Sequence, residues 1–347
     1  MSTGIDNTNN AKIDTQALAV EVLKEYGIIP ENLALIQGGS IKTVWKLAAK
    51  KNRYCLKRLK QTYDKALFSV NAQIHIKNSG GKVPGVILNI HGRPITEYNG
   101  QLFVLYEWID GNDLNFSNPA DLKLAVQGLA DFHVSTRDYV PDLQSRISTK
   151  LGRWPEQYAS MRDRMAGWKE ISLKKSALSC HASYLTYIEP VVSMANHAID
   201  LLARSQYMAL TGEGSRSIVL CHQDYGKGNA LHANDGIYVL DLDGVTFDLP
   251  ARDLRKIIGK NAENTGKWSP ETILRILGWY TEKNPLNKDE IEVLFIDMIF
   301  PHWFFGLVKN LFQKGKPLKP SEIERIGRLE ISKEKVLEKL LERSEQL

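Results

Sequence analysis

The chain has 347 residues, of which 43% are hydrophobic and 24% are charged, which is ordinary for a soluble globular protein and enough for two lobes. The net charge of +5 is mild and the basic residues are spread along the chain, so nucleic-acid binding is not indicated. Cys55, Cys180 and Cys221 lack the spacing of metal ligands and are expected to be free thiols in a reducing compartment.

Neither the polar N-terminal stretch nor the most apolar stretch of the chain indicates a membrane protein. Residues 1–12 are polar, so we predict a disordered leader and no signal peptide, with synthesis in the cytoplasm. The most apolar stretch, 293–308, contains Asp297 and Pro301 and falls short of a membrane span. We expect a buried helix there that is broken near the proline, and no membrane partner.

Residues 13–110 are predicted to form a small first lobe. A helix is expected at 15–26, where apolar residues recur at helical spacing, and Gly27 follows as a stop signal. Residues 33–47 are typical of two strands around a small-residue turn at 37–40. The lobe therefore begins with a helix and an antiparallel pair of strands.

Lys57 is the most notable residue of the next predicted strand, Arg53–Leu59. Strand alternation places it on the same side as Cys55 and Leu59, and a buried ammonium group needs an anionic partner. The alternative is a solvated basic ribbon, because residues 42–60 are rich in Lys and Arg and contain no Asp or Glu.

A second helix and two further strands complete the predicted first lobe. The helix, at 63–78, contains no Glu, and its one acid is Asp64 at the start. Antiparallel strands are expected at 85–95 and 101–109, joined by a turn at Asn99-Gly100.

The remaining residues, 111–347, are predicted to form a larger, mainly helical lobe. Apolar residues at helical spacing favour a helix that ends near His133, which we interpret as a core histidine. A helical insertion at 142–175, a long helix at 183–204 and further helices across 255–340 are expected.

Residues 219–244 carry the densest set of chemically useful side chains. Short apolar runs predict a strand, a polar loop at 222–229, a short strand, a turn at 234–236 and a strand that ends at Asp241. Such a hairpin brings the oxygen atoms of Asp224, Asn229 and Asp241 to one edge. These oxygen donors suit Mg²⁺, and a remaining carboxylate would orient or deprotonate a hydroxyl. The alternative is a polar surface hairpin in which Asp and Asn only form turns.

Three elements in this order resemble a known family. They are the pattern His222-x-Asp224-x-x-x-x-Asn229, the run Leu240-Asp241-Leu242-Asp243, and Asp248-Leu249-Pro250-Ala251-Arg252-Asp253-Leu254. Together they resemble the aminoglycoside phosphotransferase and choline kinase family, whose members are protein-kinase-like, and most closely its CotS-type spore-coat branch. The resemblance implies an α+β, bilobal fold, with an antiparallel sheet in the small lobe.

The resemblance implies that ATP and Mg²⁺ are the cofactors. Asn229 and Asp241 would bind Mg²⁺, and Lys57 would hold the α- and β-phosphates. Lys227 would neutralise charge on the transferred group, and the alternative for it is a lysine that faces solvent on the loop. A loop containing Gly38, Gly39 and Ser40 would cover the phosphates, and backbone groups of Glu107, Trp108 and Ile109 would bind adenine.

In the same comparison, Asp224 is the residue that orients or deprotonates the acceptor hydroxyl, whereas His222 and Asp253 are structural. The implied activity is phosphoryl transfer to a small-molecule hydroxyl in a protein of the bacterial spore coat, with coat proteins as further partners. The missing Glu in 63–78 leaves a second possibility, a weakly active or inactive coat scaffold.

Two other activities are less well supported by the sequence. A choline-binding aromatic cage is one possible role for a set of aromatic residues, but we expect them to lie mainly in the core; they are Trp268, Trp279, Tyr280, Trp303, Phe304 and Phe305. A protein kinase is disfavoured because Gln223 stands where protein kinases have Arg and because no activation-loop signature follows Asp241.

Overall fold

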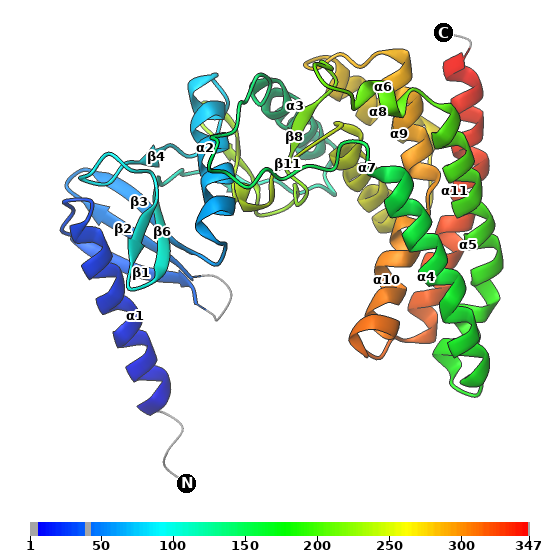
Figure 1. The fold of residues 1–347 in the computed structure, drawn as a ribbon, viewed down its shortest axis with the longest axis horizontal. Coiled ribbons are helices and arrows are strands. Elements are labelled where there is room, and N and C mark those ends of the chain that lie inside the picture. Colours follow the sequence, from blue (N-terminus) through cyan, green and yellow to red (C-terminus); the bar gives the residue numbers. More distant parts are fainter. Residues whose placement is uncertain (1–5, 39–42, 346–347) are drawn as a thin grey trace. The chain divides into compact units, whose positions relative to one another are not determined.

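The computed structural model describes residues 6–38 and 43–345, which fall into two compact units. Unit 1 comprises Met1–Leu114, Asp138–Ser148 and Lys227–Val245; unit 2 comprises Asn115–Arg137, Thr149–Gly226 and Thr246–Leu347. Unit 1 carries an antiparallel sheet and unit 2 is mainly helical (Figure 1). The predicted α+β class is confirmed. The first segment of unit 1 ends close to the expected lobe boundary near residue 110, and two later segments join the same unit.

An antiparallel sheet forms the centre of unit 1. Its strand order is β1-β2-β3-β6-β4, and β5 also pairs with β6. The strands are β1 (Asn32–Gln37), β2 (Thr43–Ala49), β3 (Asn52–Leu59), β4 (Val86–Ile87), β5 (Thr96–Tyr98) and β6 (Gln101–Glu107).

Strand alternation gives this sheet two apolar faces. One face packs Trp45, Leu56 and Phe103 against α1 (Asp6–Lys24). The opposite face packs Leu59 and Val104 against α2 (Tyr63–Asn78). Lys57 pairs with Val104 in the register of β3 and β6, so it lies on the face that α2 covers.

Helix α1 begins earlier than expected. Residues 6–12 were predicted to belong to a disordered leader, but they are helical. The stretch from Asp6 to Lys24 contains neither Gly nor Pro, so nothing in it interrupts the helix. The helix ends at Lys24, two residues before the predicted end, and the turn that follows it closes at Gly27, which has a φ of 62° and donates its N–H to the carbonyl of Lys24.

The continuous strand expected at 85–95 is wrong: only β4 forms within this range, and β5 begins just after it. Between them the side-chain oxygen of Asn89 accepts the N–H groups of His91 and Arg93, each at 3.0 Å, and this local turn replaces pairing with β6. The predicted turn at Asn99-Gly100 is present, with a φ of 49° and 68°.

A short hairpin supplies the last segment of unit 1. Strands β9 (Ala230–Ala233) and β10 (Gly236–Val239) pair through a turn at Asn234 and Asp235, as predicted, and β7 (Asn112–Asp113) pairs with β9. The predicted strand before the loop is present as β8 (Val219–Cys221), but it does not join this hairpin. It pairs in unit 2 with β11 (Thr246–Asp248).

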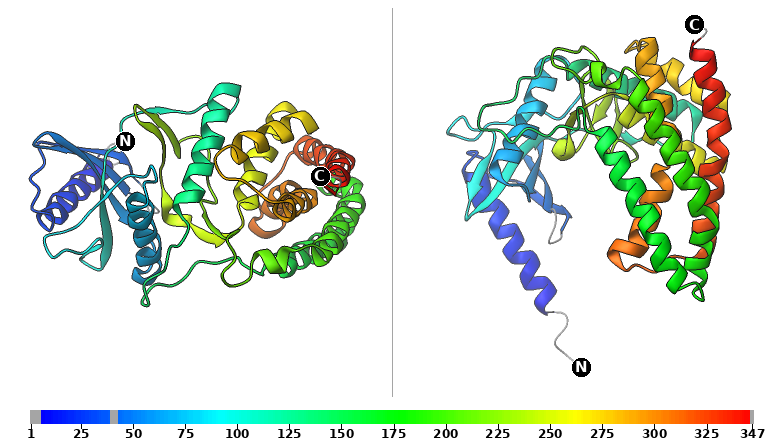
Figure 2. Two further views of the ribbon diagram at one scale, coloured as in Figure 1. Left: turned by 90° about the horizontal axis from the view of Figure 1, so that it is seen from above. Right: turned by 45° about the vertical axis from the view of Figure 1, so that its right-hand side comes forward.

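Unit 2 is built mainly from helices. They are α3 (Pro119–Ser135), α4 (Trp154–Lys174), α5 (Ser179–Arg204), α6 (Tyr207–Leu210), α7 (Ala251–Thr265), α8 (Pro270–Thr281), α9 (Lys288–Ile299), α10 (His302–Lys314) and α11 (Pro320–Glu345). The long helices α4, α5 and α11 run side by side in Figures 1 and 2.

The apolar stretch near Pro301 is a broken helix, as predicted. Helix α9 ends at Ile299 and α10 begins at His302. Taken together, Lys288–Lys314 are long and apolar enough to cross a membrane by length and composition, but 67% of the most apolar window is buried inside the protein. This burial is typical of a core helix, so the stretch is weak evidence for a membrane span.

Candidate functional site

A cavity of about 710 Å³ lies within unit 1. This volume is within the range of small-molecule and cofactor sites. Six of the residues predicted from sequence line it, namely Lys57, Glu107, Trp108, Ile109, Asn229 and Asp241. The sheet, the segment after β6 and the β9–β10 hairpin therefore bring these residues to one place.

Lys57 is held by two carboxylates in this cavity. Its Nζ lies 2.8 Å from Oδ1 of Asp241 and 2.5 Å from Oδ1 of Asp243, and only 6% of the residue is exposed. Burial alone would lower the pKa of Lys57, but the charges of Asp243 and Asp241 overcome this and raise it above its ordinary value. Lys57 is therefore a cation held in one place, and the anionic partner predicted for it is present.

Asp243 was not among the residues predicted to contribute to the site. It lies on the 3-10 turn η1 (Leu242–Gly244), directly after Asp241 and Leu242. The repeated acid in Leu240-Asp241-Leu242-Asp243 was a visible signal, but the sequence does not show which lysine the second acid contacts.

A backbone hydrogen bond holds Asn229 close to Leu240, the residue before Asp241. The N–H of Leu240 donates to the carbonyl of Asn229 at 3.0 Å. Asp241 itself adopts the left-handed conformation, with φ 63° and ψ 62°, which is uncommon for a residue other than Gly and is often found at functional sites. The amide and carboxylate oxygens of these two residues are hard donors of the kind that Mg²⁺ prefers, so the donor set fits this ion.

Glu107, the last residue of β6, is held by two hydrogen-bond donors. Its carboxylate accepts the N–H of Gly85 at 2.9 Å and an ammonium hydrogen of Lys77 at 3.0 Å. A Cβ at residue 85 would lie 2.7 Å from the Glu107 carboxyl carbon, so a larger residue there would displace this carboxylate. Burial alone would raise the pKa of Glu107, but these two hydrogen bonds lower it below its ordinary value.

Trp108 borders the same cavity. The Nζ of Lys46 lies 4.1 Å from its ring centroid, and the indole N–H donates to Asp110 at 3.2 Å. The N–H groups of Glu107 and Trp108 donate to the carbonyls of Gly85 and Arg53. These two donors are therefore used within the sheet.

The small-residue turn is described only in part. Gly38 follows β1, and an added Cβ there would lie 3.0 Å from a methyl group of Leu35. Gly39 and Ser40 lie outside the described residues. The neighbouring Ile36 and Gln37 line the cavity.

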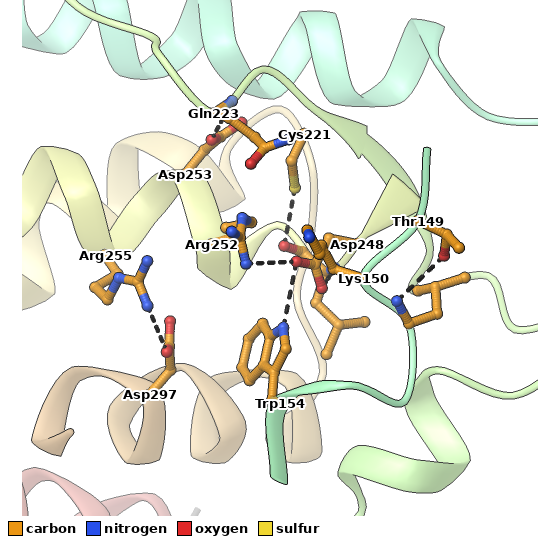
Figure 3. Close-up of polar contacts among 12 residues, drawn as sticks. Thr149, Lys150, Trp154, Cys221, Gln223, Asp248, Arg252, Asp253, Arg255 and Asp297 are labelled. Atoms are coloured by element: carbon orange, nitrogen blue, oxygen red, sulfur yellow. Dashed lines mark hydrogen bonds and ion pairs between the residues drawn. The ribbon is translucent and has the colours of Figure 1, made fainter. Parts of the chain in front are cut away.

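In unit 2, Asp253 at the start of α7 bonds to the backbone at Gln223 (Figure 3), on the loop whose next residue is Asp224. It accepts the N–H of His222 at 2.6 Å and that of Gln223 at 2.9 Å, and it is paired with His133 at 3.3 Å. Burial alone would raise the pKa of Asp253, but the hydrogen bond and charge of His133 lower it to about 2.

His222 is a structural part of this loop. It is buried, and its Nδ1 accepts the N–H of Asp224 at 3.2 Å. Gln223 has a φ of 69°. The N–H of the residue before it donates to Asp253, and the N–H of the residue after it donates to the His222 ring, so both sides of this turn are held. Asp224 belongs to unit 2, whereas Lys227 begins the last segment of unit 1.

Asp248 is the centre of a second buried network (Figure 3). Its carboxylate accepts the indole N–H of Trp154 at 3.2 Å and pairs with Arg252 at 3.1 Å. Burial raises the pKa of Asp248 to about 6, although the charge of Arg252 opposes the shift. Cys221 donates its thiol hydrogen to the carbonyl of Leu249, and burial raises its pKa well above the ordinary range, which makes it a poor nucleophile.

His133, Cys221 and Asp253 lie close enough to hold a metal ion, but all three are buried and engaged in hydrogen bonds. His133 Nδ1, for example, lies 2.7 Å from the hydroxyl of Tyr280. The predicted interpretation of His133 as a core residue is confirmed.

The aromatic residues considered for a choline cage lie mainly in the core of unit 2. Trp268, Tyr280, Phe304 and Phe305 are buried, and Trp303 packs edge-on against Trp268. This burial favours the expected packing role.

The fold is similar to that of solved kinases and phosphotransferases. A solved aminoglycoside phosphotransferase from Alicyclobacillus acidocaldarius subsp. acidocaldarius DSM 446 is similar with a TM-score of 0.75 and 17% identity, over 94% of this chain and 96% of that one. A solved amicoumacin kinase, in complex with AMP-PNP and Ca²⁺, has a TM-score of 0.59 and 16% identity, over 94% and 95%. A microcompartment-associated aminopropanol kinase has a TM-score of 0.58 and 15% identity, over 94% and 98%.

The chain belongs to the family described as "Spore coat putative kinase YutH", whose sequence profile matches residues 20–344. It is also 22% identical to spore coat protein S of Bacillus subtilis (strain 168) over 332 residues, which cover 94% of this chain and 95% of that protein. The resemblance to spore-coat, kinase-like proteins is thereby confirmed.

Proposed function

We propose that this protein binds ATP and Mg²⁺ and transfers a phosphoryl group to a hydroxyl of a small molecule in the spore coat. The observation that carries the proposal is the cavity of unit 1, where Lys57 lies beside Asp241 and where Asn229 is also part of the lining. A buried cation beside a carboxylate, in a cavity that an amide side chain also lines, is the arrangement expected for a site that holds phosphates and a divalent metal ion.

Each residue has a distinct role in this proposal. Lys57 holds phosphate oxygens, and Asn229 and Asp241 hold the metal ion. Bound ATP and Mg²⁺ would supply the phosphoryl group and neutralise its developing charge. Because the N–H groups of Glu107 and Trp108 donate within the sheet, we assign the expected adenine contact to the N–H of Ile109.

Asp224 is proposed to orient or deprotonate the acceptor hydroxyl. The bond from its N–H to His222, and the two bonds that Asp253 accepts next to it, fix the loop that carries this carboxylate. Lys227, a few residues further along the loop, is proposed to neutralise charge on the transferred group, and residues near Gly38 are proposed to cover the phosphates.

A thermal-unfolding titration tests the nucleotide and metal sites. ATP should stabilise the wild type, by about 2.7 kcal/mol at a hundredfold excess over the dissociation constant, and Mg²⁺ should increase the effect. Asp241→Asn should remove the increase due to Mg²⁺. The names of two solved proteins with a similar fold suggest the first acceptors to assay, which are aminopropanol and an aminoglycoside. Absence of any shift in the wild type would contradict the proposal.

A coat scaffold with little or no activity is the second candidate function. Membership of a spore-coat family and the absence of an acid on α2 beyond Asp64 favour it. Deleting the gene and substituting Asp224→Ala separate the two functions. A scaffold requires a coat defect in the deletion strain only, whereas a required activity gives the same defect in both strains. Coat proteins are the partners expected in either case.

A further inference from the structure

The charge that holds Lys57 comes from an unexpected part of the chain. In protein-kinase-like enzymes the corresponding lysine is normally paired with a Glu on the helix that follows its strand. Here α2 has Asp64 in its first turn as its one acid. Gln73 of α2 does line the cavity, but its side-chain N–H donates to the carbonyl of Pro84 at 2.6 Å. The helix therefore supplies an amide that is already engaged, and no carboxylate, to this part of the cavity.

Asp243 provides a carboxylate in its place. Its Oδ1 lies 2.5 Å from the Nζ of Lys57, slightly closer than that of Asp241. Lys57 is almost fully buried, so an ammonium group there would be costly without a fixed counter-charge.

The turn that carries Asp243 is anchored independently of Asp241. The side-chain N–H of Gln61, which follows β3, donates to the carbonyl of Asp243 at 2.7 Å. Leu242, on the same turn, is buried. These contacts fix the position of the Asp243 backbone relative to the strand that carries Lys57.

We propose that Asp243 is the positioning residue for Lys57 and takes the role that a Glu on α2 has in other kinase-like proteins. The inference rests on the proposed function and refines it. Two carboxylates face one ammonium group, so Asp241 is able to bind the metal ion while Asp243 continues to hold Lys57. The two acids would thus have separate roles, one toward the metal ion and one toward the lysine.

Acylation of Lys57 by a small amine-reactive reagent, followed by mass spectrometry without nucleotide or metal, tests this division directly. A buried, ion-paired ammonium group is shielded from such a reagent. Asp243→Asn should increase the rate at Lys57 by about tenfold, the effect expected for loss of a charged hydrogen bond. Lys46, which lines the same cavity but lies over Trp108, is the internal control and should not change. Asp243→Glu should restore most of the protection.

ATP binding gives a second measurement, with and without Mg²⁺. Asp243→Asn should weaken binding in both conditions, whereas Asp241→Asn should remove only the dependence on Mg²⁺. If Asp243→Asn leaves Lys57 acylation unchanged and removes only the dependence on Mg²⁺, Asp243 is a metal ligand and the inference is wrong. Failure of the wild type to bind ATP would overturn the proposed function, while the acylation rates would still decide which acid holds Lys57. Circular dichroism of each variant would confirm that it is folded.

Discussion

The carboxylate of Asp253 accepts the backbone N–H of His222 at 2.6 Å, which ties the start of α7 to the loop that carries Asp224. The same carboxylate accepts the N–H of Gln223, and it is 1% exposed. Two backbone N–H groups thus donate to the two oxygens of one buried carboxylate. The shape of the loop therefore depends on a residue that need not contact any substrate.

Substitution Asp253→Asn should therefore be strongly destabilising. The amide has a single oxygen to accept both N–H groups, and it brings two hydrogens into a buried site. We expect the free energy of unfolding to fall by about 2–4 kcal/mol, measured by denaturant titration. Asp200→Asn, on an exposed position of α5, is the control and should change stability by no more than about 0.5 kcal/mol. Equal effects in the two variants would contradict the role of Asp253.

The raised pKa of Asp248 predicts a stability change in mildly acidic solution. Burial raises its pKa to about 6, above the value of about 3.9 in an unfolded chain, so the folded state binds the proton more tightly. The protonated group therefore stabilises the fold below about pH 4, and this contribution is lost as the pH rises through about 6.

Asp248→Asn, which cannot titrate, isolates this contribution. The difference in the free energy of unfolding between wild type and variant should change by up to about 3 kcal/mol between pH 4 and pH 7. The wild type should lose stability relative to the variant as the pH rises. A difference that stays constant across this range would show that Asp248 does not titrate there.

Asp224→Asn should separate chemistry from nucleotide binding. If Asp224 orients or deprotonates the hydroxyl, phosphoryl transfer should fall by about a hundredfold or more. The stabilisation by ATP and Mg²⁺ should remain, because the residues proposed to bind them belong to unit 1. Asp235→Asn, in the exposed turn between β9 and β10, is a matched control for the removal of one acid. Activity close to that of the wild type in Asp224→Asn would exclude the proposed role.

Helix α7 packs so closely against Trp303 of α10 that the fold should not tolerate a methyl group added at Gly259. A Cβ added at Gly259 would lie 2.1 Å from the indole ring of Trp303. Gly259→Ala should lower the free energy of unfolding by about 1–3 kcal/mol, because the ring or the helix must move. The additional substitution Trp303→Leu should recover part of this loss.

Gly278→Ala is the control for that substitution. Gly278 lies inside α8 with no atom within 4 Å of an added Cβ, so Ala should be neutral or stabilising by up to about 1 kcal/mol. Both substitutions place Ala in a helix, and only the one at Gly259 creates a clash. A similar loss of stability in both would show that the Trp303 contact is not responsible.

Local sequence signals predicted many of the elements correctly. Helix α2 has the predicted bounds, 63–78, and the turns at Asn99-Gly100 and Asn234-Asp235 are where Asn, Asp and Gly favour them. The motif spacing also led to Asn229 and Asp241, since a short hairpin brings residues at its two ends together. These features depend on neighbouring residues, so a single sequence contains enough information for them.

Pairings between distant segments could not be predicted in the same way. Strand β8 has three residues, and its partner β11 follows only after the β9–β10 hairpin, so neither has a local signal for the pairing. The contact between Lys57 and Asp243 likewise joins residues that are far apart in sequence. The sequence alone shows that α2 contains no Glu, whereas the contact between Lys57 and Asp243 is visible only in the folded structure.

The assembly of unit 1 from three separate segments has a consequence for synthesis on the ribosome. Residues up to Leu114 form the whole sheet, but Asn229, Asp241 and Asp243 belong to the segment that ends at Val245. Domains often begin to fold while the chain is still being made, in order from the N-terminus. The nascent sheet must therefore carry Lys57 without its counter-charges until more than half of the chain has been translated. During this interval the nascent chain would benefit from a chaperone.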